Sequence, residues 1–218
     1  MKTVPIEIEL PQQGRGGRPG ALPGTLSLPE PARGLVAFVH GSGSSRLSPR
    51  NAYVAEVLQR AGIATLLFDL LTADEDRDRA ARFDIALLTS RLLLATDWID
   101  RQAELQSLPL GYFGASTGAA AALEAAARED ARVAAIVSRG GRPDLAGPGV
   151  LEAVRAPTLL IVGGHDDVVI ELNRKAMARM RCEAKLVIVP GATHLFEEPG
   201  TLEQVAQHAA DWFVERLR

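Results

Sequence analysis

A G-x-S-x-G pentapeptide at residues 114–118 constrains the fold of this chain more than any other feature. It follows an apolar run that ends at Phe113 and precedes the alanine-rich stretch 119–128. Between a strand and a helix, this pattern is typical of a nucleophile elbow, a tight turn that lifts a serine hydroxyl clear of the backbone. The sequence therefore predicts a strand, a sharp turn and a helix, with Ser116 presented as a nucleophile.

A candidate acid and a candidate base follow Ser116 along the chain. Residues 157–162 and 185–189 are apolar runs that predict buried strands, and turns containing Asp166 and His194 follow them. Functional loops gather where the carboxyl ends of parallel strands meet. The order serine, acid, histidine is that of the α/β-hydrolases and differs from that of chymotrypsin and subtilisin. We therefore expect Ser116, Asp166 and His194 to form a catalytic triad.

Two other carboxylates compete with Asp166 for the position of the acid. Asp167 is its neighbour, but the G-x-x-D-x-x-V spacing within residues 163–169 favours Asp166. Asp144 follows a different predicted strand, where some hydrolases carry the acid. Its neighbour Arg142 favours a structural ion pair for Asp144 instead.

The other histidines and the cysteine have simpler interpretations. His165 lies within the acid turn and His208 lies on a predicted helix, so neither follows a strand as His194 does. His40 is expected to shape its loop through a hydrogen bond and not to transfer protons. Cys182 lies in a charged stretch away from any glycine-flanked turn, which argues against a nucleophilic role.

A candidate oxyanion hole lies upstream. Residues 34–39 predict a buried strand, and residues 40–46 follow it as His-Gly-Ser-Gly-Ser-Ser-Arg. In folds with a nucleophile elbow, the amide after the nucleophile and an amide from this upstream loop hold the oxyanion. Thr117 and Ser42 are the residues in these two positions. A phosphate-binding loop is disfavoured, because Arg46 occupies the third glycine position of that motif.

Four arginines follow predicted strands and are expected at the same edge of the sheet. Arg46 and Arg50 follow the upstream strand, and Arg139 and Arg142 follow the strand at 133–137. One interpretation is recognition of an anionic substrate, with Arg46 and Arg139 as candidates, because guanidinium groups bind carboxylates with two hydrogen bonds. The alternative is bracing of loops through carbonyl groups and a carboxylate, which the abundance of arginine slightly favours.

Strands and helices are expected to alternate along the chain. Predicted strands are residues 4–10, 25–28, 34–39, 63–69, 108–113, 133–137, 157–162 and 185–189, and the loop 14–24 joins the first two. Predicted helices are residues 49–61, a helix that follows a solvated connection at 72–82 and runs to about 105, then 119–128, 170–180 and 201–217. This alternation predicts a mostly parallel, doubly wound α/β sheet with helices on both faces, in a single domain over residues 1–218.

The connection at residues 138–155 is short for a chain of this class. It has room for a loop and one helical turn, whereas many related folds insert a large helical lid here. A minimal lid predicts an open site suited to small, soluble esters or lactones.

Composition excludes several other classes of protein. The net charge of −3 gives no basic footprint, so nucleic acid is not expected as a partner. No apolar run reaches the ~18 residues needed to span a bilayer, and the first ten residues lack the apolar core of a signal peptide. A cytoplasmic location is expected, and the single cysteine requires no oxidising compartment. No cluster has metal-ligand spacing, so neither metal nor cofactor is expected, and monomer or homodimer stays open.

Four segments together resemble a branch of the dienelactone hydrolase-like α/β-hydrolases: residues 40–46, 114–118, 138–144 and 190–196. The resemblance spans nearly the whole chain, and in this branch the hydrolase module sometimes occurs beside a phosphoribosyltransferase domain. True dienelactone hydrolases use a cysteine nucleophile, whereas Ser116 occupies the matching position. The resemblance therefore implies a serine carboxylesterase or lactone hydrolase. A thioesterase or acyltransferase with the same residues, or a binding module without activity, remains an alternative.

Overall fold

The computed structural model describes residues 1–11 and 20–218, and the strands in these ranges form one sheet. The strands are β1 (Lys2–Glu9), β2 (Ala21–Leu28), β3 (Leu35–Val39), β4 (Ala64–Phe68), β5 (Leu110–Ala115), β6 (Val133–Arg139), β7 (Thr158–Gly163) and β8 (Ala184–Val189). Their order in the sheet is β1-β2-β4-β3-β5-β6-β7-β8. The β1–β2 and β2–β4 pairs are antiparallel, and every later pair is parallel.

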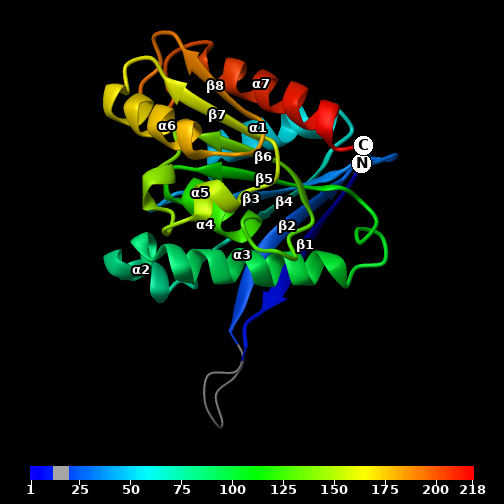
Figure 1. Cartoon of the computed structure of the whole chain (residues 1–218). Helices are drawn as coiled ribbons and strands as arrows, with labels where there is room; N and C mark the ends of the chain where they lie inside the picture. The colour runs from blue at the N-terminus through cyan, green and yellow to red at the C-terminus, as the bar shows by residue number, and fades with distance from the viewer. Residues whose placement is uncertain (12–19) are drawn as a thin grey trace.

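Helices cover both faces of this sheet (Figure 1). They are α1 (Pro49–Arg60), α2 (Arg79–Phe83), α3 (Ile85–Asp100), α4 (Thr117–Ala126), α5 (Val150–Ala153), α6 (Asp167–Arg179) and α7 (Thr201–Arg216), with short 3-10 helices η1 (Glu75–Arg77) and η2 (Pro143–Leu145). Helices α1 and α7 pack together on one face, and α3 and α4 pack together on the other. The predicted doubly wound α/β architecture is confirmed.

Strand β3 shows why the central strands are apolar without interruption. All five of its residues are buried. Leu35, Ala37 and Val39 belong to the core cluster beneath α3 and α4, whereas Val36 and Phe38 belong to the cluster beneath α1 and α7. Because successive side chains of a strand point to opposite faces, a strand covered on both sides must be apolar at every position.

Several elements begin or end at residues other than those predicted. Strand β6 continues to Arg139 and not to residue 137, because Arg139 still pairs with Ala115 of β5 and Ile161 of β7. Helix α3 ends at Asp100 and not near residue 105. Strand β2 begins at Ala21, inside the predicted loop 14–24, whose residues 14–19 lie outside the described ranges.

The connection predicted as solvated at 72–82 contains η1 and most of α2. Two aspartates mark its turns. The Asp78 carboxylate accepts a hydrogen bond from the Ala80 amide at the start of α2, and the Asp84 carboxylate accepts one from the Leu87 amide at the start of α3. Such N-caps satisfy amides that would otherwise lack a partner, which explains why the chain breaks into separate helices here.

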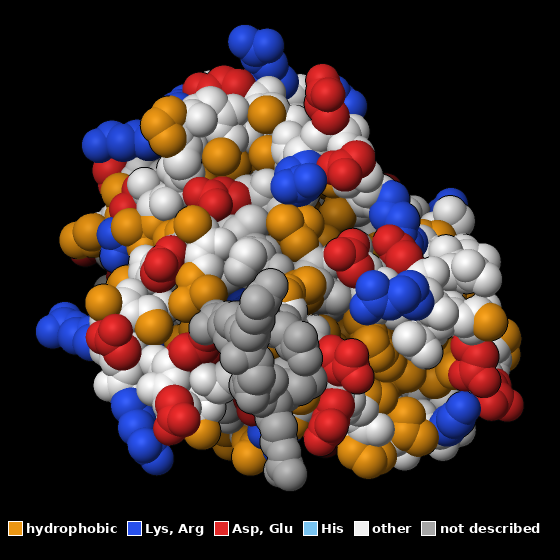
Figure 2. All heavy atoms as spheres, turned by 90° about the horizontal axis from the view of Figure 1, so that it is seen from below, with side chains coloured by type: hydrophobic (Ala, Val, Ile, Leu, Met, Phe, Trp, Pro, Cys, Tyr) orange, Lys and Arg blue, Asp and Glu red, His pale blue; other side chains and the backbone are white. Residues whose placement is uncertain are grey.

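The face seen from below carries acidic and basic side chains that are mixed in sign (Figure 2). This mixture agrees with the small net charge of −3. In the described part of the chain, no helix combines the length and the apolar character that crossing a membrane requires.

Candidate active site

Ser116 occupies the turn between β5 and α4 in the backbone conformation of an elbow. Its φ is 50° and its ψ is −118°, which is unusual for a residue other than glycine. Two residues later, a Cβ atom on Gly118 would lie 2.1 Å from the carbonyl oxygen of Val39. Glycine at this position lets α4 start directly against the end of β3, so the serine is held at the carboxyl edge of the sheet.

His194 and Asp166 form a close polar pair at this edge. The His194 Nδ1 and Asp166 Oδ2 atoms are 2.6 Å apart. Asp166 precedes α6 without capping it, so its carboxylate is available to the imidazole. Because a carboxylate accepts, Nδ1 carries the proton and Nε2 is the nitrogen that can accept another. Gly140 has a φ of 52°, and a Cβ there would lie 3.4 Å from the His194 ring, so glycine leaves room for that ring.

The two rival carboxylates lie elsewhere. Asp144 accepts two hydrogen bonds from the Arg142 guanidinium, at 2.8 and 2.7 Å, as the ion-pair interpretation predicts. That hydrogen bonding holds the pKa of Asp144 below its usual value, against the opposing effect of burial. Asp167 is the first residue of α6 and is exposed. The structure therefore brings Asp166, and neither rival, against His194.

A pocket of about 200 Å³ contains the nucleophile candidate and the imidazole. Its lining includes Gly41, Ser42, Arg50, Ser116, Arg139 and His194. In the described ranges, no hydrogen bond joins the Ser116 hydroxyl to His194. Such catalytic hydrogen bonds are often long in the free enzyme and shorten only when the substrate binds. A larger cavity of about 400 Å³ lies beside Arg46 and Asp69, but none of the three triad candidates lines it.

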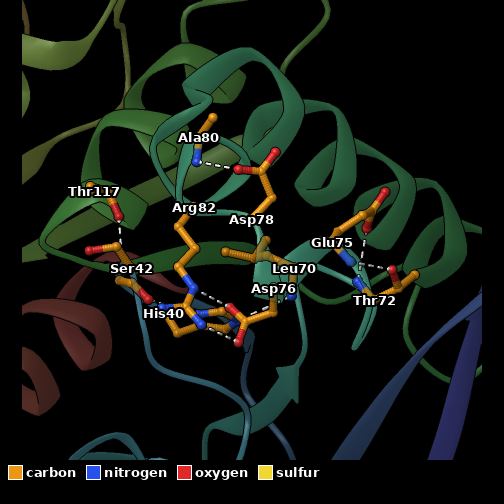
Figure 3. A network of polar contacts seen from close by, with 11 residues as sticks. His40, Ser42, Leu70, Thr72, Glu75, Asp76, Asp78, Ala80, Arg82 and Thr117 are labelled. Carbon is orange, nitrogen blue, oxygen red and sulfur yellow. Dashed lines mark hydrogen bonds and ion pairs between the residues drawn. The ribbon is translucent and has the colours of Figure 1, made fainter.

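The oxyanion loop contacts the elbow directly (Figure 3). The Ser42 amide donates to the Thr117 hydroxyl oxygen at 2.9 Å. The Thr117 amide donates to no acceptor among residues 1–11 and 20–218, as an oxyanion donor should before substrate binds. The Ser42 amide thus has an acceptor within the elbow that the sequence did not indicate.

His40 holds the same loop from its other side. Its Nε2 atom accepts from the Leu70 amide at 3.0 Å, and its Nδ1 atom donates to the Gly41 carbonyl at 3.1 Å (Figure 3). Burial lowers the pKa of His40, although its bond to Gly41 and the charges of Asp69 and Asp76 oppose that effect. A neutral His40 with the proton on Nδ1 satisfies both contacts, in agreement with the predicted shaping role.

The structure separates the four arginines that the sequence grouped. Arg46 is bound to Asp69, with its Nη1 atom 2.6 Å from the carboxylate, and it does not line the pocket of Ser116. The interpretation of Arg46 as a substrate ligand is therefore not supported. Arg50 lines the pocket in its place, together with Arg139. The ion pair of Arg46 with Asp69, which the sequence does not indicate, makes the difference.

Arg139 is buried without a carboxylate partner in the described part of the chain. Its side chain is 9% exposed, and its Nη1 atom has no hydrogen-bond partner there. Burial, together with the charge of Arg50, lowers the pKa of Arg139 to about 10. Arg50 itself contacts the exposed Glu197 through Nη1 at 3.2 Å, while its buried Nε atom has no hydrogen-bond partner among the described residues. Two guanidinium groups with unused donors thus lie in the pocket of Ser116.

Comparison with solved structures shows close relatives of this fold. The chain is 54% identical to a dienelactone hydrolase from Anabaena variabilis, covering 100% of this chain and 99% of that one, with a TM-score of 0.91. It also shares its fold with Est1E from Butyrivibrio proteoclasticus, at 18% identity, coverage of 97% and 98%, and a TM-score of 0.78.

Comparison with curated proteins gives a relative whose name describes different chemistry. The chain is 63% identical over 199 residues to the "Putative phosphoribosyl transferase" of Mycobacterium tuberculosis. The match covers 91% of this chain but 45% of the relative, so the chain spans less than half the length of that protein. No family model matches the chain.

The solved relative decides the family, because the likeness extends over the full length of both chains. It also supports hydrolase activity. The sequence motifs indicated a resemblance to this family. The fold, the elbow at Ser116 and the similarity to the solved relative agree with it. The chain belongs to the dienelactone hydrolase-like branch of the α/β-hydrolases, and Ser116 stands at the position that matches the cysteine of true dienelactone hydrolases.

Proposed function

We propose that this protein is a serine hydrolase that cleaves small carboxylic esters or lactones through an acyl-enzyme intermediate. One observation carries the proposal. The imidazole of His194, bound to Asp166 at 2.6 Å, lines the same pocket as Ser116 on its elbow. This combination of nucleophile, base and orienting carboxylate is what acyl transfer requires.

The mechanism follows from the roles of these groups. His194 Nε2 removes the proton from the Ser116 hydroxyl as its oxygen attacks the carbonyl carbon. The Thr117 amide stabilises the negative charge on the former carbonyl oxygen, and His194 returns the proton to the departing alcohol oxygen. A water molecule, deprotonated by His194, then attacks the acyl-enzyme and releases the acid and Ser116.

The pocket also suggests the character of the substrate. A volume of about 200 Å³ suits a small molecule. The abundance of arginine favours a bracing role. Arg139 and Arg50, however, have buried donors without a partner in the described part of the chain, and these favour an anionic group on the substrate. We therefore propose an ester or lactone that bears a carboxylate or a similar anion near its scissile bond.

The phosphoribosyl transferase name of the M. tuberculosis relative is not carried over to this chain. The 199 matched residues make up less than half of that protein, and here they belong to an α/β-hydrolase fold. We propose that the name describes the part of the relative that this chain does not match.

Substitution of the nucleophile tests the proposal. Ser116→Ala should lower kcat by at least ~10⁴-fold on p-nitrophenyl acetate. Ser138→Ala is the matched control, because Ser138 is buried on β6 and does not line the pocket. A fluorophosphonate should label Ser116 and not Cys182, whose thiol pKa is raised by burial. A Ser116→Ala variant with a tenth of normal activity would rule out the proposed nucleophile.

A thioesterase or acyltransferase would use the same residues. Because the pocket shows no feature that separates these activities, a panel of oxygen esters, acyl thioesters and lactones, with and without added alcohol acceptors, is the direct comparison. Faster turnover of thioesters, or acyl transfer to the alcohol, would replace the ester hydrolase proposal with one of these.

A further inference from the structure

One hydrogen bond joins the oxyanion loop to the nucleophile elbow across 75 positions of sequence. The Ser42 amide donates to the Thr117 hydroxyl oxygen at 2.9 Å (Figure 3). Thr117 is 1% exposed, and its own amide has no acceptor among the described residues. Thr117 therefore has a backbone amide without an acceptor among the described residues and a hydroxyl that already accepts a hydrogen bond.

The Ser42 amide shares one planar peptide unit with the Gly41 carbonyl, so contacts at both ends of that unit set its direction. His40 is anchored to the Leu70 amide, and the Ser44 amide donates to the Gly41 carbonyl at 3.2 Å. Gly41 lies so close to the elbow that a Cβ atom on it would be 3.1 Å from the Ser116 Cβ atom. The Gly41 carbonyl is thus held at one end of this peptide unit, and the Thr117 hydroxyl is the acceptor toward which the Ser42 N–H points at the other end.

We propose that the Thr117 hydroxyl is a positioning group that keeps the Ser42 amide aimed beside the Thr117 amide, so that both amides converge on the oxyanion. The inference rests on the proposed hydrolase function. The Ser42 N–H can share its proton between the hydroxyl oxygen and the developing oxyanion in a three-centre hydrogen bond. A donor that is aimed beforehand needs no reorganisation when the charge develops.

A threonine hydroxyl can be removed with little change of shape. Thr117→Val keeps the branched side chain and leaves the Ser42 amide without its acceptor. We expect kcat to fall by ~10- to 100-fold, a part of the loss that follows removal of an oxyanion donor, while KM changes little. Thr117→Ser keeps a hydroxyl and should restore most of kcat.

Thr158→Val is the matched control for the loss of a buried threonine hydroxyl. Thr158 is fully buried at the start of β7, and its hydroxyl donates to the Ala156 carbonyl at 3.0 Å, away from the pocket. This variant should keep the kcat of the wild type. If both valine variants lose stability equally in urea unfolding while only Thr117→Val loses kcat, the loss of kcat comes from the position of the Ser42 amide and not from a less stable fold.

The decisive measurement compares an ester with its thiono analogue, in which sulfur replaces the carbonyl oxygen. Sulfur is a weak hydrogen-bond acceptor, so the ratio of the oxygen rate to the sulfur rate reports how well the amides bind the oxyanion. The ratio should fall in Thr117→Val and recover in Thr117→Ser. An unchanged ratio, or a kcat equal to or above that of the wild type in Thr117→Val, overturns the inference.

Failure of the proposed function would look different. In that case the wild-type protein would neither react with a fluorophosphonate at Ser116 nor hydrolyse the oxygen ester, and the positioning role would fall with it. Labelling of wild-type Ser116 with no effect of Thr117→Val would overturn the positioning role alone.

Discussion

Asp166 can orient His194 because it is the last residue before α6 and does not cap that helix. Asp167, one residue later, belongs to the first turn of α6 and is exposed. A shift of one residue along the chain thus separates a carboxylate bound to the imidazole at 2.6 Å from one with no contact to it. Side-chain direction at a helix start, and not the identity of the residue, distinguishes the two.

Exchange of each aspartate for asparagine tests this distinction. Asp166→Asn should lower kcat by ~10³- to 10⁴-fold, because an amide can leave His194 with its proton on the wrong nitrogen. Asp167→Asn should have little effect. Ester hydrolysis at saturating substrate measures both. A greater loss of kcat in Asp167→Asn would show that Asp167, and not Asp166, is the acid. A comparable loss of kcat in Asp144→Asn would assign the acid to Asp144, after β6.

Arg139 should determine whether the enzyme prefers a charged ester. Arg139→Gln removes a buried guanidinium whose Nη1 atom has no protein partner in the described ranges. For an ester that bears a carboxylate, we expect KM to rise by ~10-fold or more, in line with loss of a charge-assisted hydrogen bond, while kcat falls less. For the neutral analogue, KM should change little.

Arg142→Gln is the control for that exchange. Arg142 lies at the same edge of the sheet, but its guanidinium is bound to Asp144 and does not line the pocket. The preference for the charged ester should survive in this variant. Equal KM values for charged and neutral esters in the wild-type protein would support loop bracing as the role of Arg139.

At the scale of elements, the site depends on how the loop after β3 is attached to the end of β4. His40 makes that attachment, because its ring accepts from the Leu70 amide and donates to the Gly41 carbonyl. Its pKa is lowered, mainly by burial. Since the folded protein binds this proton less readily than the unfolded chain does, stability is greatest above the unfolded pKa and falls as the pH decreases below it.

The free energy of unfolding should therefore decrease as the pH falls below ~6.5, the ordinary pKa of histidine. A proton taken up on unfolding gives a slope of up to ~1.4 kcal/mol per pH unit. Urea unfolding between pH 7.5 and 5.5 measures it. The slope should become shallower in His40→Gln and stay unchanged in His208→Gln, a substitution on α7, which contributes no hydrogen bond to His40. An identical slope in wild type and His40→Gln would exclude His40 as its source.

At the scale of the whole molecule, the parts that the sequence predicted are those that depend on local pattern. Apolar runs identified the eight strands, and the positions after them identified Ser116, Asp166 and His194 as residues of one edge. Contacts between distant segments were not predictable. The bond from Ser42 to Thr117 joins two loops through a side-chain rotamer, and the exchange of Arg46 for Arg50 in the pocket depends on an ion pair with Asp69.

The architecture also limits the size of the substrate. Between β6 and β7 the chain forms η2 and α5, which are three and four residues long, so no large lid is inserted there, as predicted. The pocket of about 200 Å³ lies below the ~300–1,000 Å³ that is usual for drug-sized ligands. Leu195 lines the pocket and is 41% exposed, so an acyl chain beyond the first carbons would remain largely in water.

Turnover should therefore stop increasing once the acyl chain exceeds a few carbons. A buried channel would gain ~0.8 kcal/mol for each methylene, so four added methylenes from butyrate to octanoate would raise kcat/KM by ~200-fold. An open pocket does not provide that gain, and a longer acyl chain adds only the entropy cost of ordering its methylene groups. We expect kcat/KM for p-nitrophenyl octanoate to be no higher than for the butyrate, both measured below the critical micelle concentration. A steady rise from acetate to octanoate would require an apolar channel that this short connection between β6 and β7 does not provide.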